Sequence, residues 1–324
     1  MSNMTEAEAL DKAERAHGLQ LDGRHQEALE YLEPAAAYFA ENDGPQSPDF
    51  ANLLMDQAES LLALCRYQDA ETAARHATEI LRSVRDLLDA ETCAGLLPRA
   101  FGLWGRSLWE LGRYEEAATP LREAIHEAEA YFGPDHPGMA EFLNGYGVLC
   151  KHWGRFDEGE RVYRRALELL EREFGPQSPQ TATLYHNLGG LEHSRGDFLK
   201  GEPLARLAYE IRSRALGEDN ELTLADAVAW GGLLDGLGKY EESVPIYRRA
   251  LAFYESRYGP EHFEVAATLN NLGVARAAQG DRAEGAALLK RCVAIKRKLF
   301  GDNHPEVQLT EANLAHITGP LDEQ

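Results

Sequence analysis

GRFDEG (154–159) and FGPQSP (174–179) are the two segments that decide the fold, because variants of both recur along the chain. The first segment recurs at a spacing of 42 residues, from leading glycine to leading glycine. GRHQEA (23–28) and CRYQDA (65–70) keep the same spacing, with five extra residues before the next copy. The later copies are GRYEEA at Gly112, GDFLKG at Gly196, GKYEES at Gly238 and GDRAEG at Gly280. A fixed period of this kind indicates a repeat protein.

The second segment recurs with the same period. Its glycine lies 21 residues after the leading glycine of the first segment, and we call these two glycines the first and second anchors of a repeat. Two independent anchors therefore share one spacing. A glycine can adopt the left-handed backbone that ends a helix, and a proline cannot continue a helix. Each unit is therefore predicted to contain a helix A, a tight turn, a helix B and a longer loop. In the fourth unit the helices are expected near 138–153 and 157–173. The other copies are FGPDHP (132–137), LGEDNE (216–221), YGPEHF (258–263) and FGDNHP (300–305).

Small residues at fixed positions predict close packing between helix A and helix B. Five units have a glycine seven residues before the first anchor, as Gly147 in the fourth unit illustrates. Helix B carries small residues five and twelve positions after the anchor, such as Gly159 and Ala166. One unit cannot bury its apolar face alone, so we expect the units to stack on one another.

The spacing L-G-x7-G-[DRK]-[YF]-x-E-[AGS] resembles a tetratricopeptide repeat. The 42-residue period and the loop [FY]-G-x-x-H-P resemble the repeats of kinesin light chains and their bacterial relatives. The resemblance implies an all-α, right-handed superhelical solenoid of stacked antiparallel helix pairs. We expect residues 1–324 to form one such solenoid, with about seven repeats and a capping helix near 305–317. The insertion near 85–93 either bends the superhelix or lengthens a helix.

Composition limits the classes of partner. The net charge is 33 − 54 = −21, which repels nucleic acids and anionic membranes, so we expect neither as a partner. No C-x-x-C spacing, apolar span or basic leader is present, so a cytoplasmic protein without a metal or cofactor is expected. A homo-oligomer is compatible with the sequence. The cysteines are interpreted as small buried residues: Cys65, Cys93, Cys150 and Cys292.

The resemblance implies that helix A of each unit lines a concave groove that binds a partner. Asn187, Asn271 and Asn313 occupy one repeat position, and the resemblance implies that asparagine there holds the backbone of an extended peptide. A carboxamide suits this role because it both donates and accepts hydrogen bonds. The alternative is that these asparagines bond the neighbouring helix and stabilise the stacking. The complete candidate set is Asn144, Asn187, Asn270, Asn271, Asn313, Arg99, Arg106, Lys151, His152, His186 and His193.

Basic residues gather in the middle of this set, in an otherwise acidic protein. Arg99, Arg106, Lys151 and His152 could attract an acidic ligand or a carboxyl terminus. The alternative is that they form ordinary ion pairs with neighbouring glutamates.

Catalytic motifs are missing from the sequence. It contains no G-x-x-x-x-G-K-[ST], H-E-x-x-H or G-x-S-x-G, and no carboxylates stand out as an acid–base pair. We therefore expect a protein- or peptide-binding scaffold or adaptor and not an enzyme. Two alternatives are a regulatory sensor that changes shape on binding a signalling peptide or small molecule, and an enzyme whose site these motifs do not reveal.

Overall fold

The computed structural model describes residues 4–302 and 304–319, and the residues that it describes form helices without any strand. The chain divides into two compact units, one ending at Leu169 and the other beginning at Leu170. The boundary falls within one helix, Phe156–Phe174. The all-α fold class and the antiparallel helix pairs are confirmed, whereas one solenoid over residues 1–324 stays a prediction.

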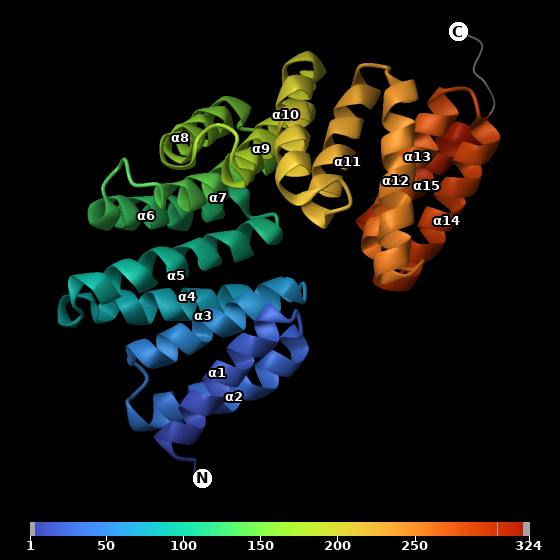
Figure 1. Cartoon of the computed structure of the whole chain (residues 1–324). Coiled ribbons are helices and arrows are strands. Elements are labelled where there is room, and N and C mark those ends of the chain that lie inside the picture. The colour runs from blue at the N-terminus through green and yellow to red at the C-terminus, as the bar shows by residue number, and fades with distance from the viewer. Residues whose placement is uncertain (1–3, 303, 320–324) are drawn as a thin grey trace. The chain divides into compact units, whose positions relative to one another are not determined.

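The first unit consists of helix pairs that lie side by side in chain order (Figure 1). The observed α7 and α8 agree within one residue with the helices expected in the fourth repeat. The elements are α1 Glu6–Leu21, α2 His25–Asn42, α3 Pro48–Ala63, α4 Tyr67–Ser83, η1 Arg85–Leu87, α5 Ala90–Glu110, α6 Tyr114–Phe132, α7 Met139–His152 and α8 Phe156–Phe174.

The second unit continues the same alternation, and the last helix among its described residues is a helix A, α15, at the position expected near 305–317. Its capping role stays a prediction. Helix α15 begins at Pro305. Proline suits the first helical turn because the N–H that it lacks has no partner within the helix there. The helices are α9 Pro179–Arg195, α10 Phe198–Leu216, α11 Glu221–Gly236, α12 Tyr240–Tyr258, α13 Phe263–Ala278, α14 Arg282–Phe300 and α15 Pro305–Thr318.

The tight turn between helix A and helix B requires a left-handed backbone residue. Gly112, Gly154 and Gly196 have φ values of 73°, 75° and 84°. Cys65 occupies the same position in the second repeat with φ 57°, although it carries a side chain. Cys65 is also exposed, so the expectation that every cysteine is buried is wrong. Its place in the turn, and not its hydrophobicity, decides its exposure.

The insertion near 85–93 forms a short 3-10 turn, η1, and extends helix α5. Helix α5 has 21 residues, whereas the other A helices of this unit have 14 to 16. Arg85 in the turn forms a two-pronged ion pair with Glu127 of α6, with N–O distances of 2.7 and 2.9 Å. The inserted residues therefore lengthen a helix, one of the two expected outcomes.

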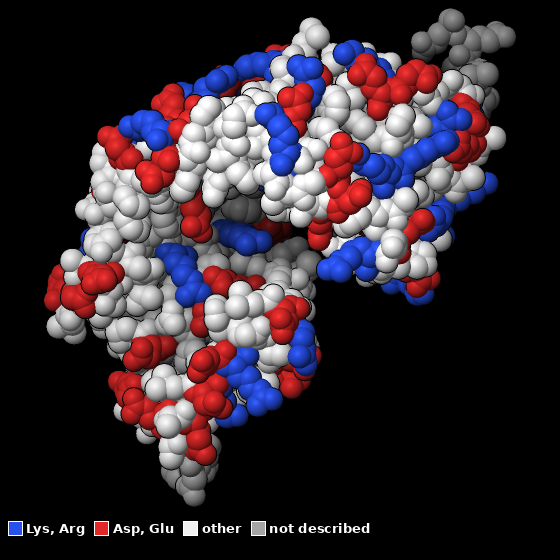
Figure 2. Space-filling view, viewed as in Figure 1, with Lys and Arg blue, Asp and Glu red and all other residues white. Residues whose placement is uncertain are grey.

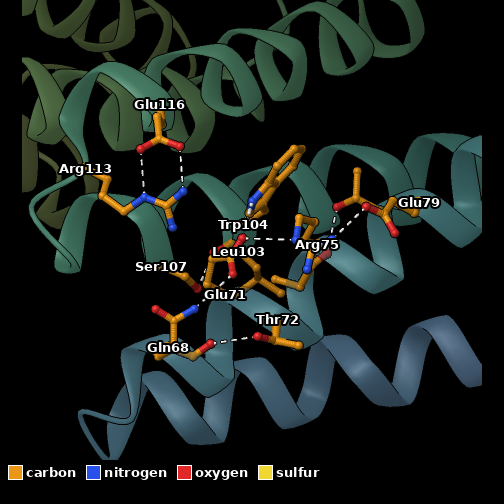
Figure 3. A network of polar contacts seen from close by, with 12 residues as sticks. Gln68, Glu71, Thr72, Arg75, Glu79, Leu103, Trp104, Ser107, Arg113 and Glu116 are labelled. Carbon is orange, nitrogen blue, oxygen red and sulfur yellow. Dashed lines mark hydrogen bonds and ion pairs between the residues drawn. The ribbon is translucent and has the colours of Figure 1, made fainter.

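A buried carboxylate ties the second repeat to the third (Figure 3). The indole Nε1 of Trp104 on α5 donates to Glu71 of α4 over 3.3 Å, and Arg75 pairs with the same carboxylate over 3.2 Å. The second unit has a similar contact to a half-buried carboxylate, since Trp230 donates to Glu202 over 2.9 Å. Both tryptophans stand eight residues before the anchor of their repeat.

The A helices form the inner side of each unit. Successive A helices pack against one another, as α3 does on α5 and α5 on α7, and as α9 does on α11. Comparable packing between successive B helices is not found among α2, α4 and α6, or among α10, α12 and α14. The A-helix surface is therefore the more tightly curved one, where a groove can form.

Candidate functional site

A groove of about 550 Å³ hollows the inner face of the first unit. Helices α3, α5, α6 and α7 contribute to its walls, and Figure 2 shows positively charged atoms on the hollowed face over α5. Three predicted site residues, Arg99, Arg106 and Asn144, line it together with Trp109 and Phe142. The structure thus brings these three residues together, and binding by them stays a prediction.

Three glycines leave the helix backbone accessible in this groove. A Cβ added at Gly95, Gly102 or Gly145 would have no heavy atom within 4 Å. Glycine inside a helix is less favourable than alanine by about 0.5–1 kcal/mol. Packing explains Gly105 and Gly147, where a Cβ would lie 2.4 and 2.5 Å from a helix B side chain. It does not explain the three groove glycines.

Arg99 forms ion pairs with the neighbouring repeat and is not a free cation. Its guanidinium contacts Asp56 Oδ1 at 2.6 Å, Glu59 Oε1 at 2.9 Å and Asn52 Oδ1 at 3.0 Å, all on α3. Burial raises the pKa of the Asp56 carboxyl, and the hydrogen bond from Arg99 offsets part of that effect. Arg99 therefore stabilises the stacking of α3 and α5, as the ion-pair alternative proposed.

Arg106 and Lys151 differ from Arg99, because neither forms an ion pair with any residue that the structure describes. Arg106 is exposed on α5 and Lys151 is half-buried near the end of α7. Burial lowers the pKa of the Lys151 ammonium. His152 is exposed, yet displacement of water by the surrounding protein and the adjacent Lys151 charge lower the pKa of its imidazole.

Asparagines at the end of the second unit bond one another. Asn313 Nδ2 on α15 donates to Asn270 Oδ1 on α13 over 3.1 Å, and Asn270 Nδ2 donates to Asn271 Oδ1 over 3.4 Å. This geometry favours the stacking role for Asn313. Asn271 contributes only a long acceptor contact, which leaves its amide donors for other partners. Asn144 and Asn187 each have interactions of their own.

His186 belongs to a largely buried polar network, and its partners Asp226 and Arg212 are not among the residues predicted from the sequence. Its Nδ1 lies 2.8 Å from Oδ1 of Asp226 on α11, and Arg212 of α10 donates to the same oxygen over 2.7 Å. The second arm of Arg212 reaches Thr183 on α9 over 2.6 Å. Asp226 is fully buried. His186 therefore helps to join α9 to α11, and His193 packs edge-on against Phe198.

One signal could have identified Arg212. Its repeat position holds Ala128 and Tyr254 in other units, so a cation there conflicts with the apolar pattern. Lys296 breaks the same rule and is also buried, with its Nζ 2.6 Å from Glu306. A charge at an otherwise apolar repeat position indicates a buried ion pair. Asp226 gives a similar but weaker signal, because Leu53, Ala100 and Leu184 hold its repeat position in other units, whereas the last units have threonine there.

The tetratricopeptide-repeat model matches residues 6–83, 96–172, 143–200, 180–256 and 227–298. These matches cover most of the chain, which therefore belongs to the tetratricopeptide-repeat family. The comparison with curated proteins finds no match.

Solved structures with the same fold include kinesin-light-chain-like proteins. BtubC (BKLC) from P. vanneervenii has 22% sequence identity and a TM-score of 0.59, over 74% of this chain and 94% of that chain. The apo form of RapI has 12% identity and a TM-score of 0.66, over 90% and 98%. A Rap protein complexed with competence and sporulation factor has 13% identity and a TM-score of 0.59, over 97% and 88%. At these identities the likeness shows the fold.

The described residues include no helix that is long and apolar enough to cross a membrane. They also contain no group of three or more His, Cys, Asp or Glu side chains arranged to hold a metal ion.

Proposed function

We propose that the protein is a scaffold or adaptor that binds a protein or peptide segment on the A-helix face of its first unit. The groove over α5 carries this proposal, because it combines a backbone-accessible floor with polar side chains at its walls. A volume of about 550 Å³ is in the range that accommodates part of an extended peptide. Tetratricopeptide proteins are typically scaffolds without catalytic activity, which supports a binding role over an enzymatic one.

The position of the charged groups supports an extended ligand. Gly95, Arg99, Gly102, Arg106 and Trp109 follow one another at spacings of three or four residues, so they share one stripe of α5. A main chain that lies along this stripe can approach the helix at each glycine. The exposed Arg106 and the half-buried Trp109 can then contact the side chains of the ligand.

A side chain placed in the groove tests the proposal without disturbing the fold. Gly102→Leu adds a side chain where a Cβ meets open space, and Gly18→Leu on α1 does the same outside the groove. Peptides selected from a random library on the wild-type protein should lose binding to the Gly102→Leu variant and keep it for Gly18→Leu. Equal binding to both variants, or no selected peptide, would contradict groove binding.

A regulatory sensor is the second candidate function. The fold likeness to a Rap protein solved with competence and sporulation factor supports it. X-ray scattering of the protein with and without a selected peptide distinguishes the two roles. A sensor should change its scattering curve on binding, whereas a scaffold should keep it.

A further inference from the structure

The inner face of the first unit carries two unpaired cations in a protein that is rich in carboxylates. The chain has 54 Asp and Glu against 33 Lys and Arg, so partners for cations are abundant. Four lysines elsewhere use them, since Lys200, Lys239, Lys296 and Lys298 pair with Glu192, Glu242, Glu306 and Glu261. The lack of an ion pair at Arg106 and Lys151, within the described residues, is therefore not due to a shortage of acids.

The two cations lie on adjacent A helices, Arg106 in the wall of the groove and Lys151 beyond it on α7. Arg106 lines the groove on α5, and α5 packs directly on α7. Lys151 lies two helical turns beyond Asn144 on the same face of α7, and Asn144 lines the groove too. The charge of Glu110, at the end of α5, acts on the pKa of His152 at the end of α7. The ends of the two helices are therefore close enough for electrostatic contact.

Acidic side chains near the groove leave both cations available. Glu59 is held by Arg99, and Glu141 lines the opposite end of the groove, at the first turn of α7. Glu110 lies one helical turn after Arg106, and among the described residues it forms no ion pair with either cation. Lys151 is half-buried without a counter-charge, and burial alone lowers the pKa of its ammonium. A cation that has lost part of its hydration gains most from an anion that enters with a ligand.

We propose that Arg106 and Lys151 form a subsite for a phosphoryl group carried by the ligand of this groove, a proposal that rests on the groove-binding function above. A phosphate monoester carries a charge of about −1.5 to −2 and three acceptor oxygens, so it can neutralise both cations. One carboxylate can neutralise only one of them. The planar guanidinium of Arg106 can bind two phosphate oxygens at once, and the Lys151 ammonium can bind the third.

Fluorescence anisotropy with three labelled peptides tests the subsite at physiological salt. The peptides share a glycine–serine backbone and differ at one central position, which is phosphoserine, glutamate or serine. We expect the phosphoserine peptide to bind at least about tenfold more tightly than the glutamate peptide, because charge-assisted hydrogen bonds to two cations are each worth about a factor of ten. Inorganic phosphate serves as the competitor that separates a phosphopeptide from a free phosphate compound.

Charge-matched variants give the control. Arg106→Gln and Lys151→Gln should each weaken phosphoserine-peptide binding about tenfold. Lys290→Gln removes an exposed cation on α14 that forms no ion pair with any residue the structure describes, and it should leave this binding within about twofold. Circular dichroism checks that the variants are folded.

Three results would overturn the proposal. They are no binding of the phosphoserine peptide, equal affinity for the glutamate peptide, or equal losses in Arg106→Gln and Lys290→Gln. If inorganic phosphate competes at a concentration equal to that of the peptide, the phosphoryl subsite is supported. Its ligand is then a free phosphate compound and not a phosphopeptide. Peptides selected from the random library would still test groove binding separately, so failure of the phosphoryl proposal can be distinguished from failure of the proposed function.

Discussion

Gly147 on α7 lies directly against the ring of Tyr163 on α8, where a Cβ would come within 2.5 Å of Cε1. Tyr163 is fully buried, so its ring cannot turn away to make room. The same contact recurs in the second unit, where a Cβ at Gly231 would lie 2.8 Å from Tyr247. The close approach of helix A to helix B therefore depends on a glycine facing a large helix B side chain.

The contrast between Gly147 and Gly145 gives the first prediction. Gly147→Ala should lower the free energy of unfolding by about 1–3 kcal/mol, because it overpacks the interface with Tyr163. Gly145→Ala should raise it by about 0.5–1 kcal/mol, because alanine is the better helix former and meets open space. Urea denaturation measures both. Changes of the same sign would show that packing does not distinguish the two positions.

The turn after α3 gives the second prediction. Cys65 adopts φ 57°, a region that is unfavourable for residues with a Cβ by about 1–2 kcal/mol. Cys65→Gly should therefore raise the free energy of unfolding by about 1 kcal/mol. Gly112→Ala, at the same position of the next repeat, should lower it by a similar amount. Thermal denaturation under reducing conditions measures both changes, and a stability loss in Cys65→Gly would contradict the explanation.

The fold could be predicted from sequence because its signals are local. The turn glycines, the proline at Pro305 and the small residues opposite helix B each act within one repeat of 42 residues. The ion pairs of the site are different, since Arg99 contacts partners 40 or more residues earlier in the chain. A flexible side chain between two repeats can reach several partners, and the sequence does not rank them. The pairing of Arg99 and the freedom of Arg106 became visible only in the structure.

The buried network of the second unit gives the third prediction. Arg212→Met should lower the free energy of unfolding by about 3–5 kcal/mol, because it leaves the buried charge of Asp226 without its cation. Asp226 Oδ2 already has no hydrogen-bond partner among the described atoms, which adds to this cost. Arg248→Met, which breaks an exposed pair with Glu284, should cost about 0–1 kcal/mol.

A double variant separates the ion pair from simple packing. Arg212→Met combined with Asp226→Leu should recover most of the lost stability, because it removes both charges together. Urea denaturation at neutral pH follows all three variants. If Arg212→Met costs no more than Arg248→Met, the network does not hold α9, α10 and α11 together.

The fourth prediction concerns pH and His152. Two effects lower the pKa of the His152 imidazole in the folded protein below its value in the unfolded chain. The larger is the displacement of water, and the smaller is the positive charge of Lys151. Between the two pKa values the unfolded chain binds more protons, so the contribution of His152 to stability increases as pH rises and is fully present above the unfolded value of about 6.5. It decreases as pH falls through that window. His152→Gln should flatten the stability profile between about pH 5.5 and 7, which urea denaturation at several pH values measures.

A titration of the imidazole by nuclear magnetic resonance provides the direct check, and Lys151→Gln should move that pKa upward because it removes the neighbouring positive charge. An imidazole that titrates at its ordinary value, with or without Lys151, would show that neither effect acts on it.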